Sequence, residues 1–520
     1  MYNSQNKQKK IKVLLEMRPA LEGFAGIPQE TRLLFRGLSH IQGVEVEGMI
    51  QTSHRTLAHG VKPDASAFQI LRAFQKGRKL NRFSRVIISM QEKPFRTLLD
   101  MVMDWVQKGM RTIELTLGTL LGTTSIRMTC FESENFKDFV WRTFFAKTLS
   151  VSDFELVTAK NFRVCSVPWN TMHTVGLNTL NFSPSPRYPR LNTQGVDIFI
   201  GQTPYPARIN KNTALVIRYH DALPIFMPHT IPEKSRHQAT HFYALMSNVK
   251  NGAWFACVSE ATRQDLLRLF PETENRAVTI HNMLSQHYFK EADSSYERVP
   301  GIIRSRLYES SGFLPNFFSL REKETFYKRA LSDRGFKYLL MVSTIEPRKN
   351  HTRLLAAWEV IKADVDPNIK LVVVGTLGWD NSSITSAFKP WIDRGELFML
   401  NAVPAPDLRV LYRHAAATVC PSLGEGFDFS GAEAMASGGI VVASDIPVHR
   451  EVYDDAAEYF DPYATMSLVK VLKKVLYEPD AHQVQQRLRE RGEEVSSRYL
   501  PEKILPQWDA FFQRVISDKS

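Results

Sequence analysis

The chain is poor in cysteine, with only Cys130, Cys165, Cys257 and Cys420 among its 520 residues. No two of them form a Cys-x-x-Cys pair, so the pattern favours neither a zinc site nor a disulfide framework. A reducing compartment is the simplest environment for such a sequence.

Long hydrophobic runs are also missing. No stretch reaches the ~18 apolar residues that a membrane-spanning helix needs. The first ten residues are polar and basic, and the apolar run at 11–15 is too short for the core of a signal peptide. We therefore expect a cytoplasmic protein that is soluble or binds the inner face of the cell membrane.

Charge is distributed unevenly. Residues 331–520 hold 22 Lys and Arg against 26 Asp and Glu, whereas residues 1–330 hold 44 against 28, a net charge of +16. A basic half suits a phosphate-rich partner such as anionic lipid or a lipid-diphosphate acceptor, although a solvated surface without a partner fits equally. No aromatic-plus-basic motif is present, so we predict no nucleic-acid binding.

The length allows two sizeable domains, and short apolar runs alternate with amphipathic segments, which is typical of an α/β protein with parallel sheets. We predict strands at 11–15, 86–89, 198–200, 215–218, 255–258, 338–342, 369–374, 397–400, 418–420 and 440–443. Residues 291–335 interrupt this alternation with Pro, Gly and charged residues, so we expect the domain boundary there. Residues 482–520 have a helical pattern.

Residues 94–122 form a strongly apolar helical segment. The simpler interpretation is that this helix packs in the core. The alternative is a helix that faces a membrane.

A loop between two carboxylates, Glu425 and Glu433, follows the strand predicted at 418–420. Ser430 and Glu433 have the spacing of a helix capping box, which would give Glu433 a purely local role. In the alternative, the helix N-terminus faces a diphosphate and Glu433 holds a ribose diol. Glu425 lies beyond the carboxyl end of a strand, where open parallel sheets bind ligands.

A second loop, at 344–350, follows the strand predicted at 338–342 and carries the adjacent cations Arg348 and Lys349. Such a pair can neutralise a diphosphate, the Arg in bidentate fashion and the Lys as a point charge. The local alternative is a basic turn paired with Glu346. One cationic loop and one Gly/Glu-rich loop in a single domain point to a nucleotide-sugar site.

The two loops together resemble family 4 of the retaining glycosyltransferases. The family pattern has Glu-Pro-Arg-Lys-Asn, Pro-Ser-x-x-Glu-Gly-Phe, Glu-Ala-Met-Ala-x-Gly and Val-Val-Ala-Ser segments, which this chain matches at 346–350, 421–427, 433–438 and 441–444. The similarity covers most of residues 336–480.

The resemblance implies the GT-B fold, in which two Rossmann-like domains with parallel sheets face each other. Residues 1–320 would form the acceptor-side domain and residues 321–485 the domain that binds the nucleotide sugar. Residues 486–520 would form C-terminal helices that cross back to the first domain.

The resemblance also implies roles for single residues. Arg348 and Lys349 would bind the donor diphosphate, Glu425 the hydroxyls of the donor sugar and Glu433 the ribose. Val403 would lie in the loop that binds the base. The segment Gly426, Phe427, Asp428, Phe429 and Ser430 would line the sugar site.

Residues of the first half resemble the family more loosely. Gly23 and Gly26 resemble its Gly-rich loop near the donor phosphates, and His220 resembles the His that faces the reacting sugar. The alternative for His220 is a structural role at a strand end. Asp428 is a departure, because the family usually has Gly there, and a Ser343-Thr344 pair stands where an Arg is frequent.

The expected activity is transfer of a hexose from a nucleotide sugar, with GDP-mannose or a GDP-rhamnose-type donor favoured, to a glycan or lipid-linked glycan in surface polysaccharide synthesis. We expect no metal and no cofactor, since Arg348 and Lys349 would take the place of a cation and no Asp-x-Asp signature lies in a suitable loop. Two alternatives stay open: a non-catalytic glycan- or nucleotide-sugar-binding protein, and a sugar-nucleotide epimerase.

Overall fold

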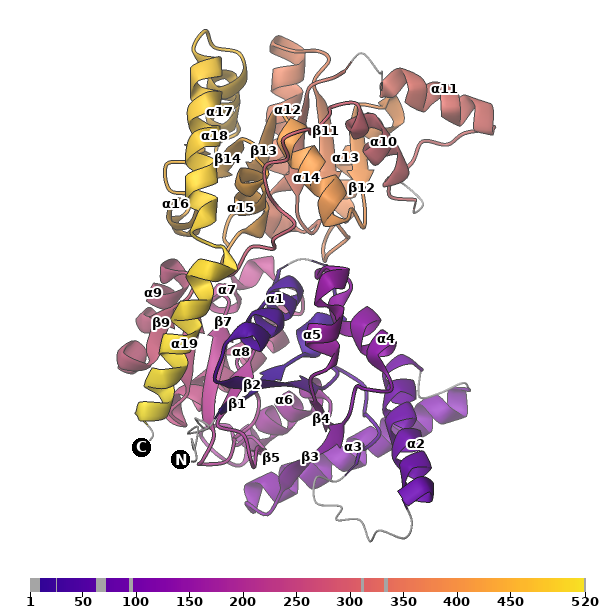
Figure 1. The fold of residues 1–520 in the computed structure, drawn as a ribbon. Helices are drawn as coiled ribbons and strands as arrows, with labels where there is room; N and C mark the ends of the chain where they lie inside the picture. Colours follow the sequence, from indigo (N-terminus) through magenta and orange to yellow (C-terminus); the bar gives the residue numbers. More distant parts are fainter. Residues whose placement is uncertain are drawn as a thin grey trace, which may run out of the picture.

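The computed structural model describes residues 10–24, 26–61, 72–92, 97–309, 313–331 and 335–518. These residues form two lobes, each built on one sheet with helices on both faces, and the lobes are stacked end to end (Figure 1).

The sheet of the first lobe has the strand order β5-β3-β4-β2-β1-β6-β7-β8-β9. Its strands are β1 (Ile11–Glu16), β2 (Val44–Ile50), β3 (Ser125–Phe131), β4 (Phe162–Cys165), β5 (Arg190–Asn192), β6 (Ile198–Gly201), β7 (Ala214–Tyr219), β8 (Trp254–Cys257) and β9 (Ala277–Thr279). Pairing is parallel from β4 to β9, with Val13 opposite Val46 and Ile198. The exception is β3, which runs antiparallel to β4 and parallel to β5.

The sheet of the second lobe is parallel throughout, with the order β12-β11-β10-β13-β14-β15. Its strands are β10 (Tyr338–Val342), β11 (Lys370–Val374), β12 (Leu397–Leu400), β13 (Ala417–Cys420), β14 (Val441–Ser444) and β15 (Ala457–Phe460). Residues 371–374 of β11 and 441–443 of β14 are short apolar runs with buried side chains, as expected for parallel strands covered on both faces.

Helices follow most of the strands. In the first lobe they are α1 (Ile27–His40), α2 (Arg72–Gln91), α3 (Leu98–Leu120), α4 (Lys137–Val140), α5 (Phe154–Thr158), α6 (Trp169–Asn178), α7 (Leu223–Phe226), α8 (Lys234–Lys250) and α9 (Glu260–Leu269). The later helices are α10 (Arg298–Ser305), α11 (Leu320–Ala330), α12 (His351–Asp364), α13 (Ser382–Arg394), α14 (Ala405–His414), α15 (Phe429–Ala436), α16 (Pro447–Tyr453), α17 (Thr465–Leu476), α18 (Ala481–Ser497) and α19 (Pro501–Ser517).

Two predictions for the first half were wrong. Residues 86–89 are not a strand but lie inside α2, whose buried face is formed by Phe83 and Val86. A short apolar run has no period of its own, so a strand and a half-buried helix look alike in sequence. The helix at 94–122 exists as α3, but of its large apolar side chains Leu115 packs in the core while most of the others are exposed: Leu98 is 78% exposed and Trp105 75%.

Two segments connect the lobes. Between β9 and β10 the chain passes into the second lobe, where Leu307 forms a β-bridge with Leu400 and α10 packs on α14. At the other end, α18 lies on the second lobe and α19 runs along the first (Figure 1). Trp508 of α19 is fully buried, and Phe511 stacks edge-on against Trp254 of β8. The domain limits at 320 and 485 stay predictions.

No helix in the described ranges combines the length and the apolar character needed to cross a bilayer.

Candidate functional site

The two loops singled out in the sequence meet at one edge of the second sheet. β10 and β13 are parallel neighbours, with Leu339 opposite Ala417, so the loops that follow them leave the sheet side by side. The first loop ends in a 3₁₀ turn, η8 (Pro347–Lys349), and the second leads into α15. The backbone N–H of Leu423 donates to the carbonyl oxygen of Arg348 at 2.9 Å and joins the two.

An ionic cluster occupies this edge. Arg348 donates through Nη1 to Glu425 Oε2 at 2.9 Å and through Nη2 to Glu346 Oε1 at 2.7 Å. Lys349 Nζ donates to the other oxygen of Glu425 at 2.5 Å. One carboxylate therefore holds both cations. The pairing of Arg348 with Glu346 that the local alternative expected is present as well.

The cluster stabilises its charges mutually. Burial alone would raise the pKa of Glu425, but Arg348 and Lys349 outweigh burial and hold that pKa below its ordinary value. Burial would likewise lower the pKa of Arg348, and the carboxylates of Glu425, Glu346 and Asp221 outweigh it, so the pKa of Arg348 is raised. The group is largely buried, and its cations are held by carboxylates that an anionic ligand could replace.

Asp428 is the N-cap of α15. Its carboxylate accepts from the backbone N–H of Ser430 at 3.0 Å and from the Ser430 hydroxyl at 2.7 Å. Its other oxygen lies 3.3 Å from Nε2 of His449. The capping box predicted for Ser430 and Glu433 is wrong, because the helix begins at Phe429 and the preceding Asp supplies the cap.

Glu433 points toward the first lobe instead of its own helix start. It accepts from Nε2 of Gln29 at 2.7 Å and from the hydroxyl of Tyr412 at 3.2 Å, and it is only 4% exposed. Burial raises the pKa of Glu433 to about 7, against the opposing effect of these hydrogen bonds. Gln29 belongs to the first turn of α1, so this acid joins the two lobes.

His220 lies just after β7, on the facing edge of the first sheet. Its Nε2 is 3.2 Å from Oε1 of Gln202, and burial together with the nearby Arg218 cation lowers the pKa of its imidazole well below the ordinary value. A Cβ at Gly426 would lie only 1.7 Å from the backbone oxygen of His220, so the close approach of the two lobes requires Gly at 426. The hydroxyl of Thr262 donates to the same oxygen at 3.3 Å.

Gly23 and Gly26 both have positive φ, 54° and 70°, and Gly26 is the N-cap of α1. Arg32 stabilises the loop, because its Nη2 donates to the carbonyl oxygens of Glu22 and Gly23. A Cβ at Gly26 would meet no atom within 4 Å. Gln29, in the first turn of the helix that follows this loop, donates to Glu433.

The aromatic residues of the predicted segment have a packing role. Phe427 and Phe429 are both buried and lie edge-to-face, and Phe427 also contacts Tyr499 of the C-terminal segment. Val403 lies in another part of the second lobe, after the edge strand β12. It is partly buried, and the helix that follows it, α14, carries Tyr412.

Three residues near the site were not predicted from sequence. Asp221 follows His220, and its carboxyl interacts electrostatically with both Arg348 and Glu425. Burial raises the pKa of this carboxyl, and Arg348 opposes the rise. Gln29 and Tyr412 bind Glu433. Asp221 could have been found as the neighbour of the predicted His, but an isolated Gln and Tyr carry no signal until the lobes are brought together.

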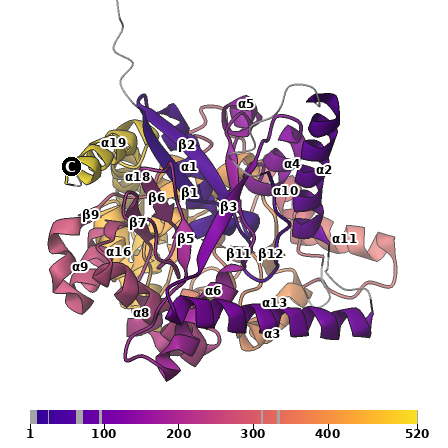
Figure 2. The ribbon, with the colours of Figure 1, turned by 90° about the horizontal axis from the view of Figure 1, so that it is seen from below.

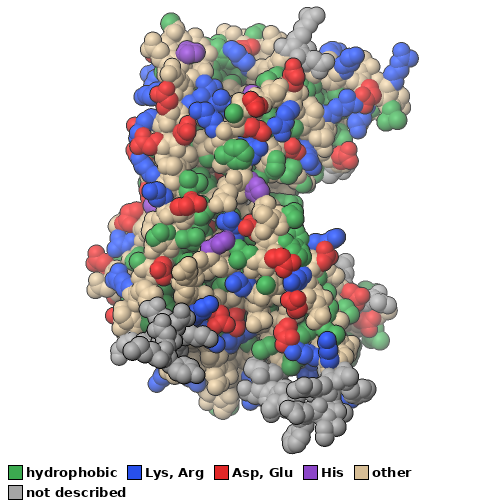
Figure 3. Space-filling model, in the orientation of Figure 1, with side chains coloured by type: hydrophobic (Ala, Val, Ile, Leu, Met, Phe, Trp, Pro, Cys, Tyr) green, Lys and Arg blue, Asp and Glu red, His purple; other side chains and the backbone are tan. Residues whose placement is uncertain are grey.

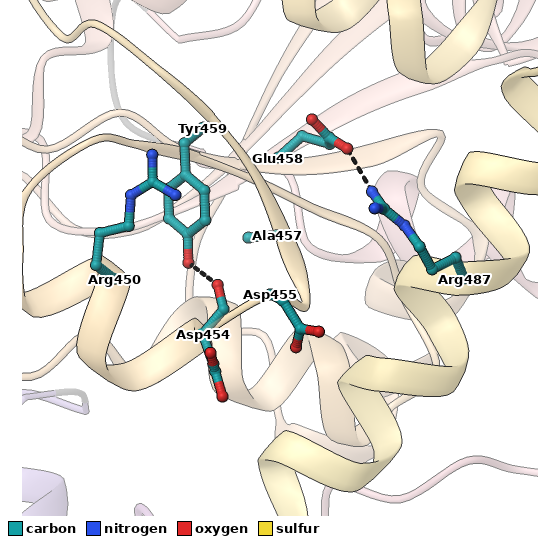
Figure 4. Close-up of a pocket in the computed structure, with 7 residues that line it drawn as sticks. All are labelled: Arg450, Asp454, Asp455, Ala457, Glu458, Tyr459 and Arg487. Atoms are coloured by element: carbon teal, nitrogen blue, oxygen red, sulfur yellow. Dashed lines mark hydrogen bonds and ion pairs between the residues drawn. The ribbon is translucent and has the colours of Figure 1, made fainter.

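The molecule is narrower between the two lobes than across either lobe (Figure 3). A separate pocket of about 410 Å³ lies on the second lobe, lined by Arg450, Asp454, Asp455, Ala457, Glu458, Tyr459 and Arg487 (Figure 4). Glu458 and Arg487 form an ion pair across it. None of the predicted site residues lines this pocket.

Residues 322–495 match the family described as glycosyl transferases group 1. The matched segment includes the second sheet, both loops and the ionic cluster.

The chain is also similar to several mannosyltransferases. Serotype-specific mannosyltransferase WbdA of Escherichia coli is 34% identical over 147 residues, which are 28% of this chain and 18% of the relative. O-antigen chain mannosyltransferase B of Escherichia coli is 29% identical over 205 residues, 39% of this chain and 46% of the relative. The chain thus matches less than half the length of either relative.

The whole chain also resembles a solved structure. Sucrose-phosphate synthase from Thermosynechococcus elongatus superposes with a TM-score of 0.57 at 13% identity, covering 98% of this chain and 100% of that one. At this identity the likeness shows the fold alone. It confirms the predicted GT-B arrangement, with a correction at one edge of the first sheet, where β3 runs antiparallel to β4.

Proposed function

We propose that the protein transfers mannose from a GDP-linked donor to a glycan or lipid-linked glycan during surface polysaccharide synthesis. The observation that carries this proposal is the buried cluster of Arg348, Lys349 and Glu425 at the carboxyl edge of a glycosyl transferases group 1 domain. The similarity to mannosyltransferases of O-antigen synthesis supports the sugar and the acceptor class.

The cluster supplies a route for binding the donor. An arriving diphosphate attracts Arg348 and Lys349, and as they turn toward it Glu425 becomes free to accept hydrogen bonds from sugar hydroxyls. Cations fixed beside the leaving phosphates then stabilise the negative charge that develops as the glycosidic bond breaks. We propose that this electrostatic preorganisation is the main catalytic contribution of the second lobe.

The remaining residues position the donor and acceptor. Glu433 and Gln29 lie together at the lobe junction, where the acid can accept from a ribose diol. Burial keeps the pKa of the His220 imidazole low, so it can hydrogen-bond a sugar hydroxyl without adding a positive charge, and its backbone lies against Gly426. We further propose transfer with retention of anomeric configuration and without a metal, as the family resemblance implies.

The decisive variant is Arg348→Ala combined with Lys349→Ala. Transfer of mannose from GDP-mannose to an acceptor glycan should fall by ~10²–10³ or more, because each lost contact to developing charge costs about that much. The matched control is Lys362→Ala with Lys370→Ala, which removes two other lysines that share one carboxylate, that of Glu396, in the same domain.

Donor titration by calorimetry completes the test. Unchanged transfer in the Arg348 and Lys349 variant would refute the proposed role of the cluster. If the unmodified protein bound GDP-mannose and acceptor but transferred nothing, the binding-protein alternative would replace the enzyme.

A further inference from the structure

The first lobe carries an apolar helix face that the protein itself does not cover. Along α3, side chains at three- and four-residue spacing point outward: Leu98, Val102, Val106, Met110, Ile113 and Leu117 are all exposed, as is Leu121 just beyond the helix. Their exposed fractions include 78% for Leu98, 61% for Ile113 and 77% for Leu121. Trp105, 75% exposed, lies on the same face. A continuous stripe of this length is rare on the free surface of a soluble domain.

The polarity of α3 is inverted relative to an ordinary surface helix. The side that faces the lobe is mostly polar: Arg111 donates to the Ser166 hydroxyl, and Thr116 and Thr119 are buried, with Leu115 as the buried apolar side chain, where α3 packs on α6. The helix lies at the periphery of the first lobe, on the side away from the second lobe (Figure 1), and extends along its edge with α2 nearby (Figure 2). Because α3 packs on the lobe through its other side, its apolar side is exposed.

Positive charge flanks the N-terminal end of this stripe. The preceding helix, α2, contains six Lys and Arg and no Asp or Glu. Lys76, Arg78, Arg82 and Arg85 are exposed along it. Only one short segment, residues 92–97, separates α2 from α3.

A basic recess flanks the other end. Arg187 donates to the carbonyl oxygen of Leu120 at the end of α3, at 3.3 Å. With Arg208 and Lys250 it lines a pocket of about 200 Å³ whose lining contains no Asp or Glu. Burial and the neighbouring Arg190 and Arg187 lower the pKa of Arg208, so these cations repel one another. A phosphate group placed here would relieve that repulsion.

We infer that α3 docks the protein on an anionic membrane surface. The helix would lie in the plane of the interface with its apolar stripe among the acyl chains, while α2 and the recess at Arg187 contact lipid phosphates. Charge at both ends decides between occupants, because a second copy of this face would bring the same cations together. The inference does not depend on the transfer reaction.

The test is sedimentation of the full chain with vesicles of phosphatidylcholine, with or without phosphatidylglycerol. Binding should require phosphatidylglycerol and weaken with salt. Two variants, Trp105→Gln with Ile113→Gln and Arg187→Glu with Lys250→Glu, should each bind the anionic vesicles at least tenfold more weakly. Phe318→Gln with Leu320→Gln is the matched control, since these side chains are 100% and 81% exposed but lie outside the surface.

Two outcomes would overturn the inference. One is vesicle binding that is absent, or that the stripe variant leaves unchanged. The other is a dimer, detected by light scattering without lipid, that the Trp105 and Ile113 variant dissociates, because the stripe would then be an interface between two copies. Circular dichroism of each variant checks that the helix content is unaltered.

Discussion

Glu433 is a buried acid whose surroundings favour its protonated form. Burial raises its pKa from 4.5 to about 7, so the folded chain holds this proton more tightly than the unfolded chain does. The stabilisation by the proton is complete below the unfolded pKa and is lost as the pH rises through the folded pKa. Folding stability should therefore decrease between about pH 4.5 and pH 7. Glu30, with a pKa also raised by burial to about 7, adds to the same trend.

Glu433→Gln should remove this group's part of the pH dependence. The amide is neutral at every pH, so the variant should gain stability relative to the unmodified protein by up to ~3 kcal/mol on going from pH 5 to pH 8. Urea unfolding at both pH values measures the difference. Identical pH dependence in the two proteins would show that Glu433 does not titrate in this range.

Some site residues could be predicted because their signal is local. Arg348, Lys349 and Glu425 each follow an apolar strand and precede a helix, and parallel pairing of β10 with β13 then brings them together. The role of Glu433 could not be settled this way. Its spacing from Ser430 fits a capping box, but its actual partner, Gln29, lies 404 positions away in sequence.

At the scale of single elements, the start of α15 depends on one side chain. Asp428 caps the helix and faces the buried imidazole of His449, whose Nδ1 donates to the carbonyl oxygen of Ser444 at 2.9 Å. The acid that departs from the family pattern thus caps the helix with one oxygen and places the other 3.3 Å from Nε2 of His449. It also takes up the N–H of Ser430, which is then not free for a phosphate.

Asp428→Ala should lower the free energy of unfolding by about 2–4 kcal/mol, since it removes a cap and leaves His449 without its partner. Asp428→Asn keeps a capping oxygen but loses the charge and should cost less. Chemical denaturation of both variants separates the two contributions. Equal losses would mean that the capping oxygen contributes nothing, whereas an Asp428→Asn variant as stable as the unmodified protein would mean that the charge opposite His449 contributes nothing.

Helices α2 and α3 show where element prediction fails. Both contain apolar segments that can be recognised in the sequence. The hydrophobic periodicity reports only which residues share a face of the helix, so it predicts neither the neighbours of the helix nor its orientation. For α3 the period is helical and the helix forms, but its apolar face is directed outward. Which side of a helix meets the core is decided by tertiary contacts, here through Thr116 and Thr119.

At the scale of the whole molecule, the lobes are joined by a carboxylate. Glu451 of α16 accepts from the backbone N–H groups of Glu260 and Ala261 at 2.6 and 2.9 Å, and so caps α9 of the first lobe from outside. The same carboxylate lies 2.8 Å from Nε2 of His281. A helix N-terminus attracts negative charge, so this contact favours the closed arrangement of the lobes.

Glu451→Gln should shift the protein toward more open arrangements. The amide cannot supply the negative charge, and one of its two terminal atoms is a donor facing N–H groups. Small-angle X-ray scattering should report a larger radius of gyration than for the unmodified chain. Glu458→Gln, which alters a carboxylate paired only within the second lobe, is the control. No change in the scattering of the Glu451 variant would show that the contact does not hold the lobes closed.

The strands of the second lobe were easier to predict from the sequence than those of the first lobe. All five strands predicted after residue 330 are present, since each is a short buried run between helices. In the first lobe β2, β3, β4, β5 and β9 were missed. The antiparallel β3 has a mixed burial pattern, and its place beside β4 depends on pairing across distant sequence.

The chain passes between the lobes twice, once before β10 and once from α18 to α19. A single connecting segment would let one lobe rotate about any axis relative to the other. Two attachment points fix an axis, so the relative motion is reduced to rotation about the line that joins them. Such a rotation would separate Gln29 from Glu433 and His220 from Gly426 as parts of one movement.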